Sequence, residues 1–533
     1  MSRYLGLVFA TAASVAATAL PVPARAQQDD TEKQFGIVHF ETSCNETAQR
    51  RFDRAMRYQH SFWYQSSKEI FEETLKADPQ CAIAYWGIAL SLLWNPHVPT
   101  PAKNLAEGAA AIAKGKSIGA KSQRERDFID ALAVMYADHD KVPHGARVQA
   151  YLKAMEAVAK HYPQDDEAQI YYALALDVAA SPADKTYANQ LKAAAILEDI
   201  FKRQPQHPGV AHYLIHSYDY PPIAEKGLDA ATRYSKIAPT APHAQHMPSH
   251  IFTRVGYWKE SIAANAASVR AAKADKEYGD QLHGQDYMVY AYLQLAQDKN
   301  ARAVIDEMAA GTGVNPDLPG ASFALAASPA RYAMERGDWS GAAALEVRPS
   351  KFSHVMAISH FARAVGAARS GKPDAANADI AKLAELRDKL REAKDAYWAE
   401  QVDIQSQVAT AWLLYAEGKH NDALKALSAA ADLEDKTEKH PVTPGVPKPA
   451  REQYGVMLLE RGNAKEALIA FEATLKKEPN RLGAYVGAAQ AATKTGDSAK
   501  AKTYYQKVVG IAANADQTRV EVADARAFLA KTQ

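Results

Sequence analysis

The chain has 533 residues, and its 63 Lys and Arg side chains balance 62 Asp and Glu side chains to leave a formal net charge of +1 at pH 7. A balance this close argues against a nucleic-acid surface or an anionic membrane as the partner. A chain of this length usually divides into several globular domains, whereas a repeat array grows by stacking similar units and escapes that limit.

The N-terminus has the pattern of a secretory signal peptide. Arg3 precedes an apolar run over residues 5–20, and small residues at Ala24 and Ala26 come before the polar Gln27. The apolar run is shorter than the roughly 20 residues that span a bilayer. We therefore expect cleavage after Ala26, a periplasmic or secreted protein, and no membrane span. N-terminal sequencing of the exported protein should begin at Gln27, and a start more than a few residues away would contradict this prediction.

The chain contains two cysteines, Cys44 and Cys81, each placed just before a helical stretch. In an oxidising compartment an even number of cysteines tends to pair. We predict a disulfide that joins the first two repeats and contributes about 3–4 kcal/mol by restricting the unfolded chain. The alternative is a pair of buried free thiols.

From Glu46 onward apolar residues recur at helical spacing, which predicts an all-α chain. The sequence also repeats with a period of about 34 residues, that of a tetratricopeptide helix pair. Small residues at fixed points let two antiparallel helices approach closely, and aromatic residues fill the space between pairs. The clearest copy contains Tyr454, Gly455, Gly462, Ala467, Phe471 and Pro479. The predicted fold is a right-handed superhelical solenoid of helix-turn-helix repeats.

The repeats and their interruption predict four segments. A signal peptide over residues 1–26 is followed by a helical solenoid over 27–434, which carries the histidine cluster described next. A Pro-rich, charged loop spans 435–449, and a C-terminal repeat pair with a capping helix spans 450–533. We expect the capping helix between Gln517 and Thr532.

Two histidine pairs recur at the repeat period. His212 and His216 are four residues apart and share one helix face, and His246 and His250 each follow their counterpart by 34 residues. They should occupy the same positions of consecutive first helices, facing the concave side. Such helices lie about 10 Å apart, so the four imidazoles can converge on one shared ion or ligand. Further candidate ligands nearby in the sequence are His243, His283, Asp219 and Asp286.

Imidazoles with a carboxylate suit a divalent transition metal, and Zn, Cu and Fe are the candidates. In a metal-dependent enzyme, Asp219 or Asp286 would act as a base beside an open coordination position. In a binding protein, the histidines would line a groove that takes a protein segment or a small ligand. A third alternative is that they only cap helices and pack internally. The chain has no Gly-x-Ser-x-Gly elbow and no phosphate-binding loop.

Aromatic residues upstream of the histidines have two explanations. At helical spacing they usually form the core between repeats. The alternative is a ligand-binding wall beside the histidines, to which we assign Tyr171, Tyr172, Tyr213 and Arg254.

From Phe40 to about Gln297 the chain resembles a group of exported bacterial tetratricopeptide-repeat proteins. The phrases that carry the resemblance are Ser43-Cys44, Asp78-Pro79 with Cys81 to Gly87, Ala211 to His216, and His246 to Ile251 with Arg254, Gly256 and Asn265. The resemblance implies the fold and the importance of these histidines, without a reaction. One departure is Asp286, which stands where the group often has a second histidine after the one matching His283.

Overall fold

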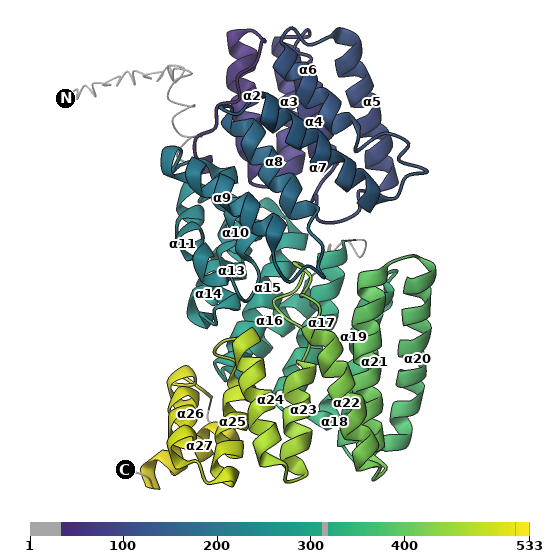
Figure 1. The fold of residues 1–533 in the computed structure, drawn as a ribbon, viewed down its shortest axis with the longest axis vertical. Coiled ribbons are helices and arrows are strands. Elements are labelled where there is room, and N and C mark those ends of the chain that lie inside the picture. Colours follow the sequence, from purple (N-terminus) through teal and green to yellow (C-terminus); the bar gives the residue numbers. More distant parts are fainter. Residues whose placement is uncertain (1–33, 312–317, 517–518, 532–533) are drawn as a thin grey trace, which may run out of the picture.

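The structure is a computed structural model that describes residues 34–311, 318–516 and 519–531, and this part of the chain consists of helices with no strand (Figure 1). The predicted all-α tetratricopeptide-type array is therefore confirmed. The predicted signal peptide lies outside the described residues. Among the described residues, no helix is both long enough and apolar enough to cross a membrane.

The first third of the chain forms helical hairpins in which each helix packs on the next. Its helices are α2 (Glu46–His60), α3 (Tyr64–Ala77), α4 (Ile83–Leu92), α5 (Ala102–Ile118), α6 (Gln123–Ala133), α7 (His144–His161), α8 (Asp166–Val178), α9 (Ala188–Arg203) and α10 (Pro208–Tyr218).

The middle of the chain continues the array from α10 to the helices that support the histidine region. Its helices are a 3-10 turn η1 (Ala224–Gly227), α11 (Leu228–Ile237), α12 (Pro242–His246), α13 (Pro248–Arg254), α14 (Trp258–Asp275), α15 (Tyr278–Gln294), α16 (Asp298–Ala310), α17 (Pro319–Glu335) and α18 (Trp339–Ala343).

The C-terminal array, green to yellow in Figure 1, keeps the hairpin pattern to its end. Its helices are α19 (Ser353–Arg369), α20 (Pro373–Glu392), α21 (Ala396–Ala416), α22 (His420–Asp435), α23 (Ala450–Glu460), α24 (Ala464–Lys477), α25 (Leu482–Thr495), α26 (Ser498–Ile511) and α27 (Val520–Lys531). The last helix packs on α26 and is the expected capping helix.

The first helix of the second histidine repeat is interrupted, where the sequence predicted a continuous helix. Met247 ends α12 and Pro248 begins α13. Proline has no N–H to donate and crowds the preceding turn, so a new helix starts at this position. His246 and His250 therefore sit on two short helices, on either side of the break.

Cys44 and Cys81 form a disulfide, with Cα atoms 5.1 Å apart, as predicted. The bond closes a loop over a sequence separation of 37 residues and joins the start of α2 to the start of α4. Serine at both positions should lower the free energy of unfolding by about 3–4 kcal/mol, because the reduced unfolded chain gains entropy. Urea denaturation with and without reductant measures the effect. A wild-type midpoint that does not change on reduction would contradict it.

The C-terminal array folds back onto the middle of the chain. The indole N–H of Trp258 donates to the carbonyl of Asn480 at 2.9 Å. Gly256 has φ +71°, and a Cβ there would collide with the backbone of Pro479. Glycine is required at this point for the backbone angle and for the close approach. The C-terminal array and the middle of the chain thus enclose the region that lies between them.

Residues 436–449, which we call the crossing segment, run from α22 to α23 through this enclosed region (Figure 1). The Tyr287 hydroxyl donates to the carbonyls of Pro441 and Thr443 at 3.3 and 3.2 Å. Arg331 donates to the Gly445 carbonyl at 2.6 Å. Glu438 accepts from Lys185, on the N-terminal half, at 2.8 Å. The predicted loop is thus tied by its backbone carbonyls to α15 and α17 and by the Glu438 side chain to the N-terminal half.

Candidate metal centre

Six histidines gather into two groups of three. In the first triad the Nε2 atoms of His216 and His243 each lie 3.1 Å from Nε2 of His212. In the second triad Nε2 of His246 and Nε2 of His250 are 3.0 Å apart, and His283 completes the group. Within each triad one ring nitrogen per histidine lies within 4.8 Å of the other two. The repeat therefore brings each predicted pair together with a third histidine, and this geometry favours two sites over one shared site.

The second triad contains a close contact between two ring nitrogens, His246 Nε2 and His250 Nε2, which the neighbouring protein groups satisfy poorly. The Nδ1–H of His246 donates to Asn265 Oδ1 at 2.6 Å, and the Nδ1–H of His250 donates to Asp219 Oδ2 at 2.9 Å. Asn265 is oriented by its own amide, which donates to the Ser261 carbonyl at 2.7 Å. A neutral imidazole has one N–H and one lone pair, so both Nε2 atoms present lone pairs to each other.

Two lone pairs at 3.0 Å repel unless a positive charge lies between them. Burial lowers the pKa of His246 well below its ordinary value and also lowers that of His250, so a proton is not favoured in this position. A metal ion satisfies both nitrogens. Two nitrogens bound at about 2.0–2.1 Å to one tetrahedral ion are about 3.3 Å apart, close to the observed separation.

The first triad has a similar arrangement. The Nδ1–H of His212 donates to the carbonyl of His60 at 2.7 Å, which leaves the lone pair on Nε2, where His216 and His243 approach. Burial, followed by the neighbouring histidines, lowers the pKa of all three rings well below the ordinary value. Neutral imidazole is the form that binds a metal.

Asp219 is held by three buried groups and orients the second triad. Besides His250, Arg254 donates from Nε to Asp219 Oδ1 at 2.8 Å, and Lys439 of the crossing segment donates at 3.2 Å. Burial alone would raise the pKa of Asp219, but Lys439, Arg254 and His250 together bring it well below its ordinary value. Burial also lowers the pKa of Lys439 to about 8. A carboxylate behind a ligating histidine fixes its tautomer and raises its basicity.

A third cluster with metal-like spacing is satisfied without an ion. Glu167 accepts from Nε2 of His60 at 3.1 Å and from Nε2 of His207 at 3.0 Å. The opposite nitrogens accept in turn, from the Tyr213 hydroxyl at 3.0 Å and from the Val210 N–H at 3.3 Å. Each ring therefore has one donor and one acceptor contact. This cluster supports the first triad through the His60 carbonyl.

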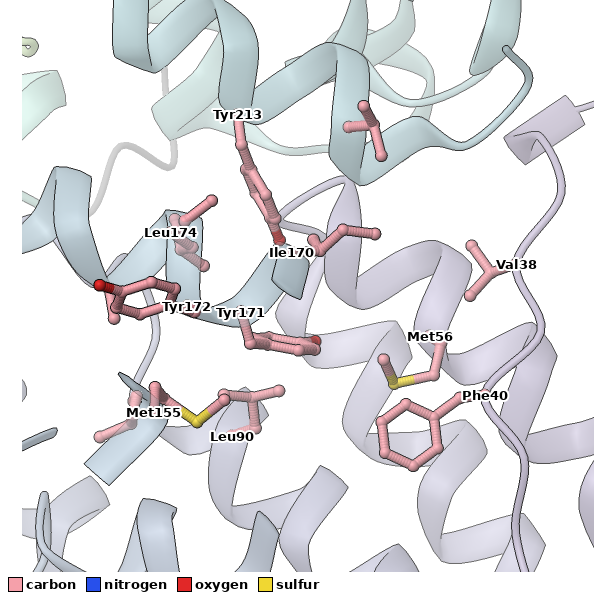
Figure 2. Packing of buried hydrophobic residues seen from close by; sticks show 14 of the residues in the cluster. Val38, Phe40, Met56, Leu90, Met155, Ile170, Tyr171, Tyr172, Leu174 and Tyr213 are labelled. Atoms are coloured by element: carbon pink, nitrogen blue, oxygen red, sulfur yellow. The ribbon is translucent and has the colours of Figure 1, made fainter. Parts of the chain in front are cut away.

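Some predicted site residues lie elsewhere. Asp286 pairs with Arg331 and accepts from Ser328 at 3.0 Å, in neither triad. Tyr171 lies in the N-terminal core, against Trp86 and Phe128 (Figure 2). The Tyr172 hydroxyl accepts from Lys192 at 2.5 Å. Tyr213 also belongs to the core but borders the site, because its ring lies 5.2 Å from that of His212.

Two residues of the site were missed by sequence reasoning. His97, in the loop between α4 and α5, stacks on His216 with ring centroids 4.7 Å apart. Lys439 reaches Asp219 from 220 residues away in sequence. His97 is an isolated histidine beside Pro-rich sequence, and Lys439 is one of several charges in its segment, so neither has a local pattern that signals the site.

No protein-family model matches the chain, and no curated protein sequence matches it. Among solved structures, the chain is similar to the APC/C hetero-tetramer Cut9-Hcn1, with 12% identity, 95% of this chain and 80% of that chain covered, and a TM-score of 0.37. It is also similar to the human IFIT1 dimer with m7Gppp-AAAA, with 12% identity, 91% and 100% coverage, and a TM-score of 0.33. Naa15/Naa10 bound to HypK-THB matches with 15% identity, 91% and 79% coverage, and a TM-score of 0.23. Identities and TM-scores this low indicate nothing about what the chain binds.

Proposed function

We propose that this chain is an exported metal-binding protein that holds two transition-metal ions, one in each histidine triad. The observation that carries the proposal is the 3.0 Å contact between Nε2 of His246 and Nε2 of His250, whose opposite nitrogens already donate to Asn265 and Asp219. The Tyr287 hydroxyl lies 3.4 Å from Nε2 of His250, but its single hydrogen is shared with two backbone carbonyls, so the two lone pairs remain poorly matched and their desolvation poorly compensated. The disulfide fits export to an oxidising compartment.

The donor set favours copper or zinc among the metals considered. All six ring nitrogens are imidazole, and the nearest carboxylate, Asp219, binds His250, Arg254 and Lys439. Non-haem iron sites usually include a carboxylate ligand, and calcium and magnesium require oxygen ligands. Three imidazoles suit both zinc and copper, which accept nitrogen ligands at low coordination number.

The arrangement of the carboxylates disfavours the enzyme alternative with an aspartate base. Asp219 binds two cationic side chains and Asp286 binds Arg331, so neither is free to take a proton from a water on the metal. The crossing segment also occupies the space that a peptide from a partner protein would need on the concave face. Tyr287 and Arg331 hold the segment there through its backbone carbonyls. Both observations favour metal binding as the primary role of the histidines.

Metal content of the exported protein, purified without a metal-binding tag and reconstituted with Cu or Zn, tests the proposal. Wild type should hold about two ions per chain. His212→Gln and His246→Gln should each hold about one, because each removes the central nitrogen of one triad, and the double variant should hold none. His360→Gln is the matched control: it alters a largely buried histidine that binds a carboxylate, Asp379, in the C-terminal array, and it should keep both ions.

A wild-type protein that retains no metal after reconstitution would overturn the proposal. So would variants of both triads that keep the wild-type content. The competing hypothesis is that the histidines bind a peptide that displaces the crossing segment. In that case the histidine variants should change the affinity for the peptide and leave the metal content unchanged.

A further inference from the structure

The two triads adjoin each other. The ring centroids of His216 and His250 are 6.3 Å apart, and those of His243 and His246 are 6.2 Å apart. Within the second triad, the rings of His250 and His283 are also 6.3 Å apart. Neighbouring rings within each triad are closer, at 4.4–4.9 Å, but the two triads are separated by no more than His250 and His283 are, so ions in the two triads would lie within reach of one small ligand.

The ligands leave the charge of two ions unbalanced. Each triad consists of neutral imidazoles, and among the described residues the carboxylate that binds a triad histidine, Asp219, is already matched by Arg254 and Lys439. Glu438 pairs with Lys185, and Asp286 pairs with Arg331. Uncompensated charge in a buried site is costly, and a bound metal is the largest local charge there. An anion from solution would supply the negative charge that the protein itself does not supply.

A seventh histidine adjoins the first triad. His97 stacks on His216, at 4.7 Å between ring centroids. Its Nε2 is buried and has no hydrogen-bond partner among the described residues. Such a nitrogen needs a partner, and an imidazole N–H is a good donor to an anion.

Lys439 places a further positive group beside the centre. It lines two hollows next to the crossing segment, together with Gln401, Gly445 and Val446. Its ammonium nitrogen is 3.2 Å from Asp219. Lys439 thus adds positive charge next to the second triad, where Asp219 accepts from it and from His250.

We infer that the two ions form one binuclear centre that binds a single small inorganic anion between them, with the Nε2–H of His97 donating a hydrogen bond to that anion. This inference rests on the proposed function. In two-metal sites the ions are commonly about 3.5–4 Å apart, a distance that one or two bridging atoms span.

Copper(II) and azide are the probes for this inference. In wild type loaded with about two Cu(II) per chain, magnetic coupling should reduce the integrated electron paramagnetic resonance intensity well below that of two isolated ions. His212→Gln, with one ion left, should give the full intensity for that ion. Azide, followed by visible absorption, should bind wild type with about one azide per ion pair and should bind the one-ion variant at least about 10-fold more weakly.

His97→Phe should keep both ions and the coupling but weaken azide binding by about 10-fold, since one hydrogen bond to a charged group is lost. His144→Phe is the matched control, because its Nδ1 is also buried without a partner but it begins α7, outside the two triads. If wild type binds two copper ions and each gives its full electron paramagnetic resonance intensity, the inference is wrong and the proposed function still stands. Unchanged azide affinity in His97→Phe would overturn the part assigned to His97. Failure to bind copper at all would instead overturn the proposed function.

Discussion

Replacing Asp219 with Ala is expected to lower the free energy of unfolding by about 3–5 kcal/mol, because it leaves two buried cations, Arg254 and Lys439, without their carboxylate. It should also weaken metal binding in the second triad by about 10–100-fold, since His250 loses the acceptor that fixes its tautomer. The first triad, whose orienting acceptor is the His60 carbonyl, should keep its ion. Urea denaturation of the metal-free protein and metal titration measure the two effects separately.

Asp379→Ala is the matched control for this variant. Asp379 is also a buried carboxylate that binds a histidine and an arginine, His360 at 2.7 Å and Arg363 at 3.1 Å, but it lies in the C-terminal array. Its loss should lower stability and leave both metal affinities unchanged. If Asp219→Ala binds two ions as tightly as wild type, Asp219 does not orient the second triad.

Acidification below about pH 6.5 should both release the ions and destabilise the metal-free protein. Burial lowers the folded-state pKa of all six triad histidines: His212, His216, His243, His246, His250 and His283. In the unfolded chain these rings titrate near 6.5. Below that pH the unfolded state takes up protons that the folded state does not, so the free energy of unfolding falls with falling pH. The stability that the six buried neutral histidines contribute is fully present above about pH 6.5.

Each histidine contributes up to about 1.4 kcal/mol per pH unit to this slope. Urea denaturation of metal-free protein between about pH 7.5 and pH 5.5 measures it. The double variant His212→Gln with His246→Gln should show a shallower slope, because two of the buried bases are gone. A free energy of unfolding that stays constant over this range in wild type would mean that these rings are protonated or exposed in the folded state.

Sequence periodicity predicted the parts of the site that lie on consecutive repeats. The spacing of four residues placed His212 with His216 and His246 with His250 on one helix face each, and the 34-residue offset placed the two pairs on neighbouring helices. It predicted the disulfide for a similar reason, because Cys44 and Cys81 occupy corresponding positions before neighbouring helices. The assignment of each pair to its own triad depends on His243, which lies on the short helix α12, and on His283, which lies on α15 of the next repeat. The exact repeat register of these two histidines could not be read from the sequence.

The groups that enclose the site depend on how the whole array closes. His97 reaches the first triad from the loop between α4 and α5, and Lys439 with the crossing segment reaches the second triad from the C-terminal array, which packs on Gly256 and Trp258 through Asn480. No local pattern encodes such a contact. Asp286 was predicted as a ligand from its place on the helix that carries His283, but the facing helix supplies Arg331, and a buried ion pair satisfies both side chains.

Anomalous diffraction from crystals of the copper- or zinc-loaded protein tests metal binding by the triads most directly. Data collected on either side of the metal absorption edge should give two peaks per chain, one among His212, His216 and His243 and one among His246, His250 and His283, each within about 2.0–2.1 Å of the Nε2 atoms that converge there. Peaks only at the Glu167 cluster or on the surface, with both triads empty, would contradict the account.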